Sequence, residues 1–318
     1  MLAQSIEAAK RGRVVKRASL DTTVQPKAVA HPTDSRLLNR AREQLVDAAQ
    51  EAGVALRQSY ARVGRAAEHQ AGRYAHAKQY RRMQREIRKL RTWLGRVIRD
   101  VQRKGGEIAG ALKTKLDVAQ RLYVQRRDSK NKLYALHAPE TECIAKGKAR
   151  TPYEFGVKVS VAVTAKEGLV VGMRSMPGNP SDGHTVDSQI EQIGLLTGTT
   201  PKMALVDRGY RGVQADAGTR LLVSHTRRLP KKLKKLLKRR QVVEPMIGHM
   251  KADGLLDRNW LKRALGDAMH AVLCGAGHNL RMILAHLRVL LLALIGQLAL
   301  ALLILTPPPP SSVPRRAA

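Results

Sequence analysis

The hydrophobic period changes along this chain, and that change constrains the fold more than any other feature. Apolar residues recur at helical spacing for almost a hundred residues after Ser35, and then alternate as in a strand over 154–164. A second strand-like run, 169–176, follows a short connection and predicts a hairpin. A short β-favouring piece around 20–24 precedes the helical stretch. We therefore expect a mixed α/β core that is split by an all-helical insertion.

The C-terminal half continues to alternate between strands and helices. The pattern predicts a helix over 184–196, strands over 202–207 and 219–225, and a basic helix that begins at Pro230. In α/β sheets, reactive side chains gather beyond the carboxyl ends of strands. Polar residues at strand ends are therefore the first candidates for a functional site.

These changes of pattern divide the chain into four parts. Residues 1–34 hold the first strand, 35–130 the basic helical insertion, 131–285 the rest of the α/β core, and 286–318 a Leu-rich helix with a Pro-rich tail. The proline run cannot continue a helix, so we expect the tail to be disordered.

The helical insertion contains three heptads of apolar residues. Alternating steps of three and four connect Tyr80, Met83, Ile87, Leu90, Leu94, Val97 and Val101. Such spacing is typical of a coiled-coil seam, either within a helical hairpin or between chains. From Arg57 to Lys104 the sequence has 15 basic residues against three acids. One side should be strongly positive, either as a solvated face or as a contact with DNA.

The overall charge indicates a polyanionic partner. The chain has 58 Lys and Arg against 25 Asp and Glu, a formal net charge of +33, which far exceeds what solubility requires. Neutralising phosphates releases condensed counterions, so we expect nucleic-acid binding that weakens steeply with salt. Aromatic residues make up only 3%, which argues against a surface that stacks the bases of a single strand.

The cysteines and the hydropathy argue against a disulfide-bonded, zinc-binding, secreted or membrane protein. Cys143 and Cys274 lie far apart and neither belongs to a C-x-x-C pair, so we expect neither disulfides nor zinc, in a reduced cytosolic setting. The N-terminus has no apolar core of signal-peptide length. The 17-residue apolar run 289–305 is interrupted by Gly296 and Gln297 and is short for a membrane span. We expect it to pack on the body or a partner, and we expect no membrane.

Three acids are candidates for phosphate chemistry. Asp207 ends the predicted strand 202–207, where it would either pair with an arginine such as Arg208 or hold a divalent cation. Asp21, at the predicted end of the first strand, and Glu244, on or near a helix, favour the cation. Together they form a hard oxygen-ligand set suited to Mg²⁺ or Mn²⁺. Two such ions about 3.5–4 Å apart can activate a water or a 3′-hydroxyl towards a phosphodiester.

Cations accompany the glutamate. Arg240, Glu244 and Lys251 fall within about 40° on a helix, so that one face would hold the acid and grip phosphates. Pro245 either kinks this helix or begins a new one. The seven cations of 231–240 fit either an amphipathic helix over phosphates or a solvated face. They include Lys231, Lys232 and Lys235.

The residues of two smaller motifs either take part in the functional site or stabilise nearby helices. Asp182 and His184 lie in SDGHT, where capping of the following helix is the favoured interpretation over a role in the site. Asn279 and Arg281, in GHNLR, either reach DNA or fix helix packing.

Several stretches together resemble the DDE transposases of bacterial insertion sequences, in particular the insertion-sequence-five family. These stretches are 21–38, 136–164, 178–185, 206–212 and 239–281. The resemblance implies an RNase H-like fold, a catalytic triad of Asp21, Asp207 and Glu244, and Mg²⁺- or Mn²⁺-dependent cleavage and strand transfer. It further implies double-stranded DNA as partner (terminal inverted repeats and target), a homo-oligomer on that DNA, and a bacterial, nucleoid-associated location.

The chain departs from the family in three places. The signature Tyr-x2-Arg-x3-Glu-x6-Lys matches at Arg240, Glu244 and Lys251, but its tyrosine position is Leu237. Only 20 residues precede Asp21, where relatives usually carry a helical DNA-binding region, so we expect a truncated copy. The strand before Asp21 reads KRASL instead of an apolar run, which predicts weak anchoring. The alternative function is a non-catalytic DNA-binding remnant that pairs with an intact transposase, for which the heptad seam would be suited.

Overall fold

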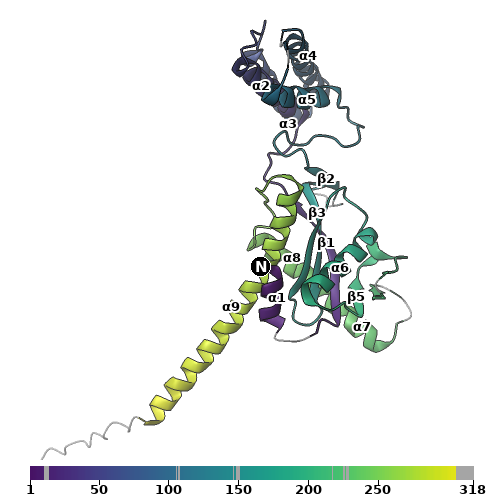
Figure 1. Cartoon of the computed structure of the whole chain (residues 1–318), viewed down its shortest axis with the longest axis vertical. Coiled ribbons are helices and arrows are strands. Elements are labelled where there is room, and N and C mark those ends of the chain that lie inside the picture. The colour runs from purple at the N-terminus through teal and green to yellow at the C-terminus, as the bar shows by residue number, and fades with distance from the viewer. Residues whose placement is uncertain are drawn as a thin grey trace, which may run out of the picture.

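The computed structural model describes residues 1–10, 14–104, 106, 108–145, 147, 151–216, 218–224, 226 and 229–305. The predicted disordered tail and the last residue of the predicted strand 219–225 lie outside these residues. In Figure 1 a helical bundle stands at one end, a body of strands and helices lies in the middle, and a long helix leaves the body at an angle.

The body is built on one mixed sheet, which confirms the expected α/β architecture. Its strand order is β2-β3-β1-β5-β6, with β4 also paired to β3. The pairs made by β3 with β1, β2 and β4 are antiparallel, whereas β5 is parallel to both β1 and β6. The strands are β1 (Arg17–Pro26), β2 (Glu142–Ala145), β3 (Tyr153–Thr164), β4 (Val170–Met176), β5 (Met203–Val206) and β6 (Arg220–Val223).

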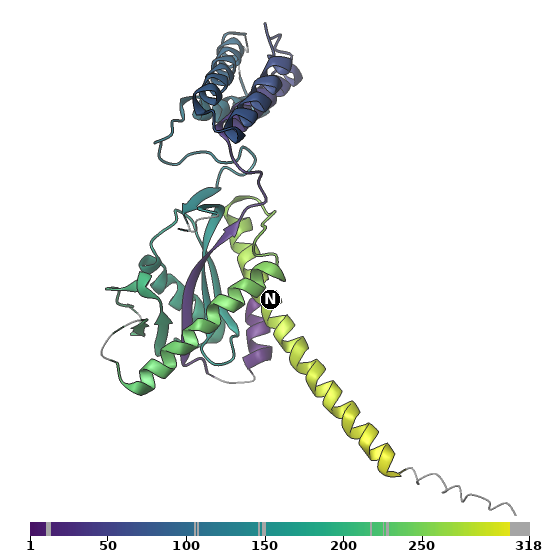
Figure 2. The same ribbon diagram turned by 180° about the vertical axis from the view of Figure 1, so that it is seen from behind.

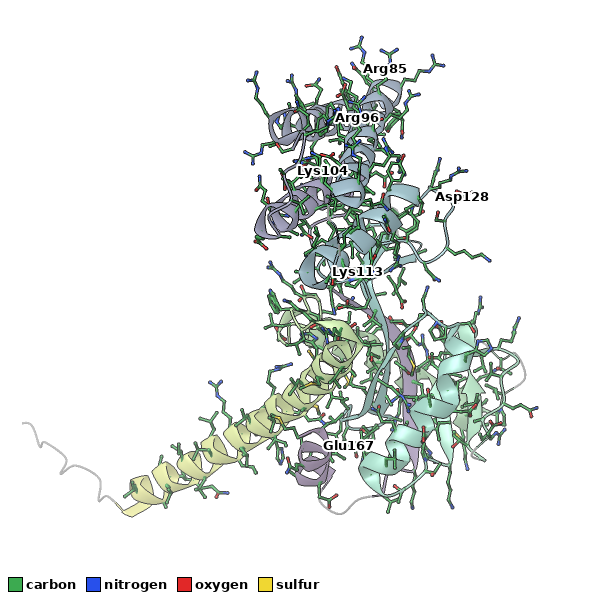
Figure 3. The ribbon with its side chains drawn as sticks, turned by 45° about the horizontal axis from the view of Figure 1, so that its top comes forward. Arg85, Arg96, Lys104, Lys113, Asp128 and Glu167 are labelled. Carbon is green, nitrogen blue, oxygen red and sulfur yellow. The ribbon has the colours of Figure 1, made fainter. Side chains whose placement is uncertain are left out.

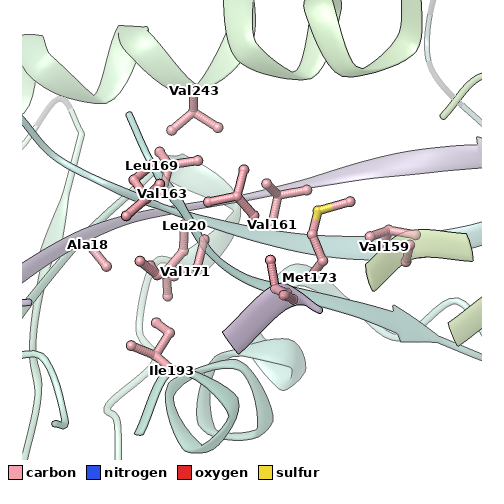
Figure 4. Close-up of a cluster of buried hydrophobic side chains, with 14 of the residues drawn as sticks. Ala18, Leu20, Val159, Val161, Val163, Leu169, Val171, Met173, Ile193 and Val243 are labelled. Atoms are coloured by element: carbon pink, nitrogen blue, oxygen red, sulfur yellow. The ribbon is translucent and has the colours of Figure 1, made fainter. Parts of the chain in front are cut away.

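Helices cover both faces of this sheet, and this explains why β3 is apolar on both sides. Figure 4 shows Val243 and Ile193 on opposite sides of the strands, with Val161 and Leu20 between them. The helices of the body are α1 (Leu2–Lys10), α6 (Val186–Thr197), α7 (Lys231–Lys238), α8 (Val243–Ala252) and α9 (Arg263–Leu305). The sequence pattern did not predict α1, a short helix whose Leu2 and Ile6 are buried in the same core.

The insertion forms a four-helix bundle with a core of its own. Its helices are α2 (Asp34–Glu51), α3 (Ala61–His76), α4 (Tyr80–Lys104) and α5 (Gly110–Val124). The heptad residues of α4 from Ile87 to Val101 are buried there, against residues of α2 such as Leu45. The seam therefore closes within one chain, and the prediction that it suits pairing with a second chain is wrong.

The helix α9 packs on the body over its first part only. Asn279 fixes it to β4, because its side chain accepts from the Val170 amide and donates to the Val170 carbonyl, both at 2.9 Å. Packing is thus the role that the structure gives Asn279. Further along, Leu290 is 50% exposed and Leu302 is 64% exposed. The expectation that the Leu-rich segment packs on the body is wrong for the described residues.

One helix among the described residues, α9, is long and apolar enough to cross a membrane by length and composition. None of its most apolar window is buried in the structure.

Candidate active site

Asp21 lies in the middle of β1, and the prediction that it ends the strand is wrong. On one side β1 pairs with β3 from Ala18 to Pro26, where Asp21 lies opposite Val161. On the other side β1 pairs with β5 only as far as Ser19. The expected weak anchoring is also wrong, because backbone pairing on both sides and the buried Ala18 hold the strand.

Asp207 follows the last residue of β5. The final β1–β5 pair joins Ser19 to Leu205, so continuing this parallel register by two residues aligns Asp21 with Asp207. The Asp207 Oδ1 atom accepts a hydrogen bond of 2.8 Å from the Gly209 amide and so caps the short 3₁₀ helix η2 (Arg208–Tyr210). Two acids from distant parts of the sequence are therefore brought side by side.

Arg240 connects Asp21 to Glu244. One guanidinium nitrogen lies 3.2 Å from Asp21 Oδ2 and the other lies 3.3 Å from Glu244 Oε1. The Arg240 side chain is only 15% exposed, whereas that of Glu244 is 66% exposed. The ion pair anticipated between Asp207 and Arg208 is not found among the described residues; the arginine that pairs at this site is Arg240.

The sequence left open whether Pro245 kinks a helix or begins a new one, and the backbone shows that a new helix begins two residues before it. A 3₁₀ turn, η3 (Arg239–Val242), follows α7, and a new helix, α8, begins at Val243 with Pro245 in its first turn. Pro245 is tolerated there because its missing amide hydrogen has no intrahelical partner. Figure 2 shows α7, η3 and α8 following one another across one face of the sheet. Arg240 thus keeps the same side as Glu244.

The carboxyl of Asp21 has an unusual affinity for protons. Burial raises its pKa from 3.8 to about 6, although the Thr22 amide hydrogen bond and the Arg240 charge oppose the rise. The negative charges of Asp207 and Glu244 raise the pKa further. Asp207 and Glu244 therefore lie near enough to Asp21 to act on its charge, but among the described residues the three carboxyls are not placed to share one metal ion.

Asp182 is a fourth acid at this site. Its Oδ1 atom accepts from Thr22 Oγ1 at 2.8 Å and from Lys158 Nζ at 3.2 Å. The favoured interpretation as a helix cap is wrong, since Asp182 lies within η1 (Asp182–Thr185), Thr185 is the N-cap of α6, and no side chain caps α6. A Cβ on Gly209 would lie 2.8 Å from Asp182 Oδ2 and 3.1 Å from Asp207 Oδ1, so glycine permits this close approach.

Tyr210 is a buried residue near these acids. Burial raises the pKa of its phenol above the ordinary value, and the charges of Asp182, Asp21 and Asp207 raise it further. Sequence reasoning did not assign Tyr210 a role, because its proximity to Asp21 depends on how β5 pairs with β1.

The predicted DNA-binding cations lie on α7, η3 and α8, except Arg208, which lies on η2. On α7 the side chains of Lys231, Lys232 and Lys235 are exposed, while Leu236 is buried, which confirms an amphipathic helix. On α8 the Lys251 ammonium lies 3.6 Å from the Glu154 carboxylate. Arg208 is exposed beside Asp207.

The donor set fits a hard divalent cation in its chemistry, since Asp21, Asp207 and Glu244 offer carboxylate oxygens alone. Over the part of the chain that the structure describes, no three Asp, Glu, His or Cys side chains are placed to share one metal ion. Arg240 instead supplies the positive charge between Asp21 and Glu244.

Comparisons with known proteins give little functional information. No family model matches the chain. Over 85 residues it is 49% identical to a Rhizobium meliloti protein described as "Uncharacterized protein ORF8 in nfe locus". That match covers 25% of this chain and 41% of the relative, so the chain spans less than half of that protein. No solved structure matches the chain.

Proposed function

We propose that this chain is a DDE-type transposase of bacterial insertion sequences, which cleaves and joins DNA phosphodiesters on an RNase H-like core. The observation that carries the proposal is that the charges of Asp207 and Glu244 both act on the carboxyl of Asp21, while Arg240 pairs with Asp21 and Glu244. The sheet topology supports it, because three antiparallel strands, β4, β3 and β1, continue into two parallel ones, β5 and β6. This is the arrangement expected of an RNase H-like fold.

In this proposal the three acids hold Mg²⁺ or Mn²⁺. The bound ions would lower the pKa of an attacking water or hydroxyl and stabilise charge on the phosphate and the leaving oxygen. The exposed lysines of α7, together with Lys251 and Arg208, are the groups that bind the DNA phosphates nearby.

Arg240 has two tasks in this proposal. It is now the counter-charge of Asp21 and Glu244, and it keeps two repelling acids together. Once these carboxylates ligate a divalent ion, the guanidinium is free to donate a pair of parallel hydrogen bonds to a phosphate. Lysine could not replace it, because an ammonium cannot form that fork.

The test is cleavage of duplex DNA that carries the element's terminal repeats, with Mn²⁺ and the purified full chain. We expect nicking by the wild type, and a loss of at least about a hundredfold in Asp207→Asn, since metal-assisted charge stabilisation supplies several kcal/mol. Asp128→Asn is the matched control, because Asp128 is an exposed acid outside the site (Figure 3). Equal nicking by wild type and Asp207→Asn would refute the assignment.

One observation favours a second candidate function, a non-catalytic DNA-binding remnant or regulator. No three acids are placed to share a metal ion in the described chain, and Arg240 stands between two of them. Calorimetric titration with Mn²⁺ distinguishes the two functions. Binding that is lost in Asp207→Asn supports the enzyme, whereas DNA binding without any Mn²⁺ binding supports the remnant. The heptad seam is buried and offers such a regulator no pairing surface.

A further inference from the structure

The outer face of α4 carries a row of exposed arginines. We call the arginine row Arg81, Arg85, Arg88, Arg96, Arg99 and Arg103. At about 100° per residue these six side chains fall within about 80° of one another, opposite the buried heptad seam. Figure 3 shows Arg85, Arg96 and Lys104 following one another along the bundle.

Little negative charge opposes this row. The two acids of α4 already have partners: Glu86 pairs with Lys89 at 2.8 Å, and the buried Asp100 accepts from the Arg57 amide at 2.7 Å and pairs with Arg103. Among the described residues, the side chains of Arg81, Arg85 and Arg99 have no hydrogen bond or ion pair. A fold-stabilising role therefore does not explain these three guanidinium groups.

The length of the row matches a duplex. From Arg81 to Arg103 the helix rises by about 33 Å at about 1.5 Å per residue, and one turn of B-DNA is about 34–36 Å long. A straight positive helix face of this length can lie beside a duplex for one turn and contact phosphates where the strands cross it.

The side chains within the row argue against other polyanions. Among the described residues of this face of α4 there is no aromatic side chain to stack the bases of a single strand, and Tyr60, which accepts from Arg96 at 3.5 Å, is stacked on Trp93. The other exposed side chains on and beside the row, Gln84, Lys89, Thr92 and Gln102, are polar, so they are not suited to enter a lipid surface or to anchor a protein partner.

We propose that the arginine row of α4 binds the phosphate backbone of duplex DNA at a surface separate from the candidate active site. The bundle stands apart from the sheet in Figures 1 and 2, so DNA held on this row lies beyond the end of the α/β body. Because the contacts are to phosphates, the row positions the duplex and reads no sequence. The inference rests on the proposed function only in naming DNA as partner, and it needs neither metal nor the acids.

The experiment measures binding of the full chain to a fluorescent random-sequence duplex of about three helical turns, in EDTA, over a range of KCl concentrations. The variant is Arg81→Gln with Arg85→Gln and Arg99→Gln. We expect the slope of log affinity against log salt to become shallower by about 3, close to one for each lost phosphate contact. Circular dichroism should show an unchanged melting temperature, because these side chains have no partner among the described residues.

The matched control removes the same charge from the body, with Lys166→Gln, Lys202→Gln and Arg220→Gln at exposed positions near the strand ends. Its slope should stay close to that of the wild type. An equal change in both variants, or no change in the α4 variant, would overturn the proposal. Equally tight binding of a single strand by the wild type would overturn the assignment to duplex DNA.

The two proposals fail separately. A chain that nicks DNA while the α4 variant keeps its full salt slope would refute the arginine row alone. A chain that never nicks, but loses slope in that variant, would refute the enzyme alone.

Discussion

At the scale of single residues, opposing effects act on the pKa of the Asp21 carboxyl. Its backbone is paired with Val161 of β3, and the charges of Asp207 and Glu244 act on its carboxyl. The Thr22 amide and Arg240 compensate its charge only in part, and burial leaves its pKa at about 6. A carboxyl whose pKa is raised in this way binds a proton at a higher pH than an exposed aspartate does.

This raised pKa makes stability depend on pH. Between 3.8 and about 6 the folded chain binds a proton at Asp21 that the unfolded chain releases, so stability due to this group falls as pH rises through that window. Relative to the wild type, the free energy of unfolding of Asp21→Asn should therefore rise by about 2 kcal/mol between pH 4 and 7.

Urea unfolding measures this difference through Trp260 fluorescence in a Trp93→Phe background, because Trp93 belongs to the bundle. The control substitution Asp128→Asn, at an exposed position outside the site, should change the free energy of unfolding by less than about 0.5 kcal/mol. A pH-independent difference for Asp21→Asn would show that its carboxyl has an ordinary pKa in the folded chain.

At the scale of elements, a buried ionic cluster ties the bundle connections to α9. Lys27, just after β1, lies 2.9 Å from Glu140 in the segment that returns from the bundle, and it also pairs with Asp267 on α9. Asn259 donates to the same Asp267 oxygen at 2.6 Å. Burial raises the pKa of Asp267, which the Lys27 charge counteracts. One lysine therefore neutralises acids from two other parts of the chain.

Replacing Lys27 should lower the free energy of unfolding. Lys27→Met leaves Glu140 and Asp267 without their shared counter-charge, and a broken buried pair typically costs about 3–5 kcal/mol. Lys16→Met, at an exposed position before the same strand, should cost less than about 0.5 kcal/mol. The free energy of unfolding in urea gives both values, and equal losses in the two variants would contradict a central role for the cluster.

At the scale of the whole molecule, the described residues of the body and of the bundle build separate cores, and one apolar segment is left uncovered. The body and the bundle bury distinct clusters, and the Leu-rich part of α9 belongs to neither. Its leucines are exposed at consecutive positions, including Leu290, Leu291 and Leu292, so apolar surface faces all directions around the helix. Such a large exposed patch promotes association.

A chain ending after Arg288 tests this consequence. Because the removed side chains that the structure describes, 289–302, are exposed, the melting temperature should change by less than about 2 °C. The full chain should sediment as larger species than the shortened one at equal concentration, because the apolar helix is its association surface. If both chains sediment as monomers, the exposed leucines do not drive association.

The sequence by itself determined the local elements. Periods in the hydrophobic pattern specified the hairpin of β3 and β4, the amphipathic α7 and the seam of α4, because each depends on neighbours within a few residues. The tertiary structure alone decided that Asp21 lies mid-strand opposite Val161, that Asp182 bonds to Thr22 rather than capping a helix, and that the seam closes within one chain. These outcomes depend on the register between distant segments, which is set by the burial of whole faces and leaves no mark in a local pattern.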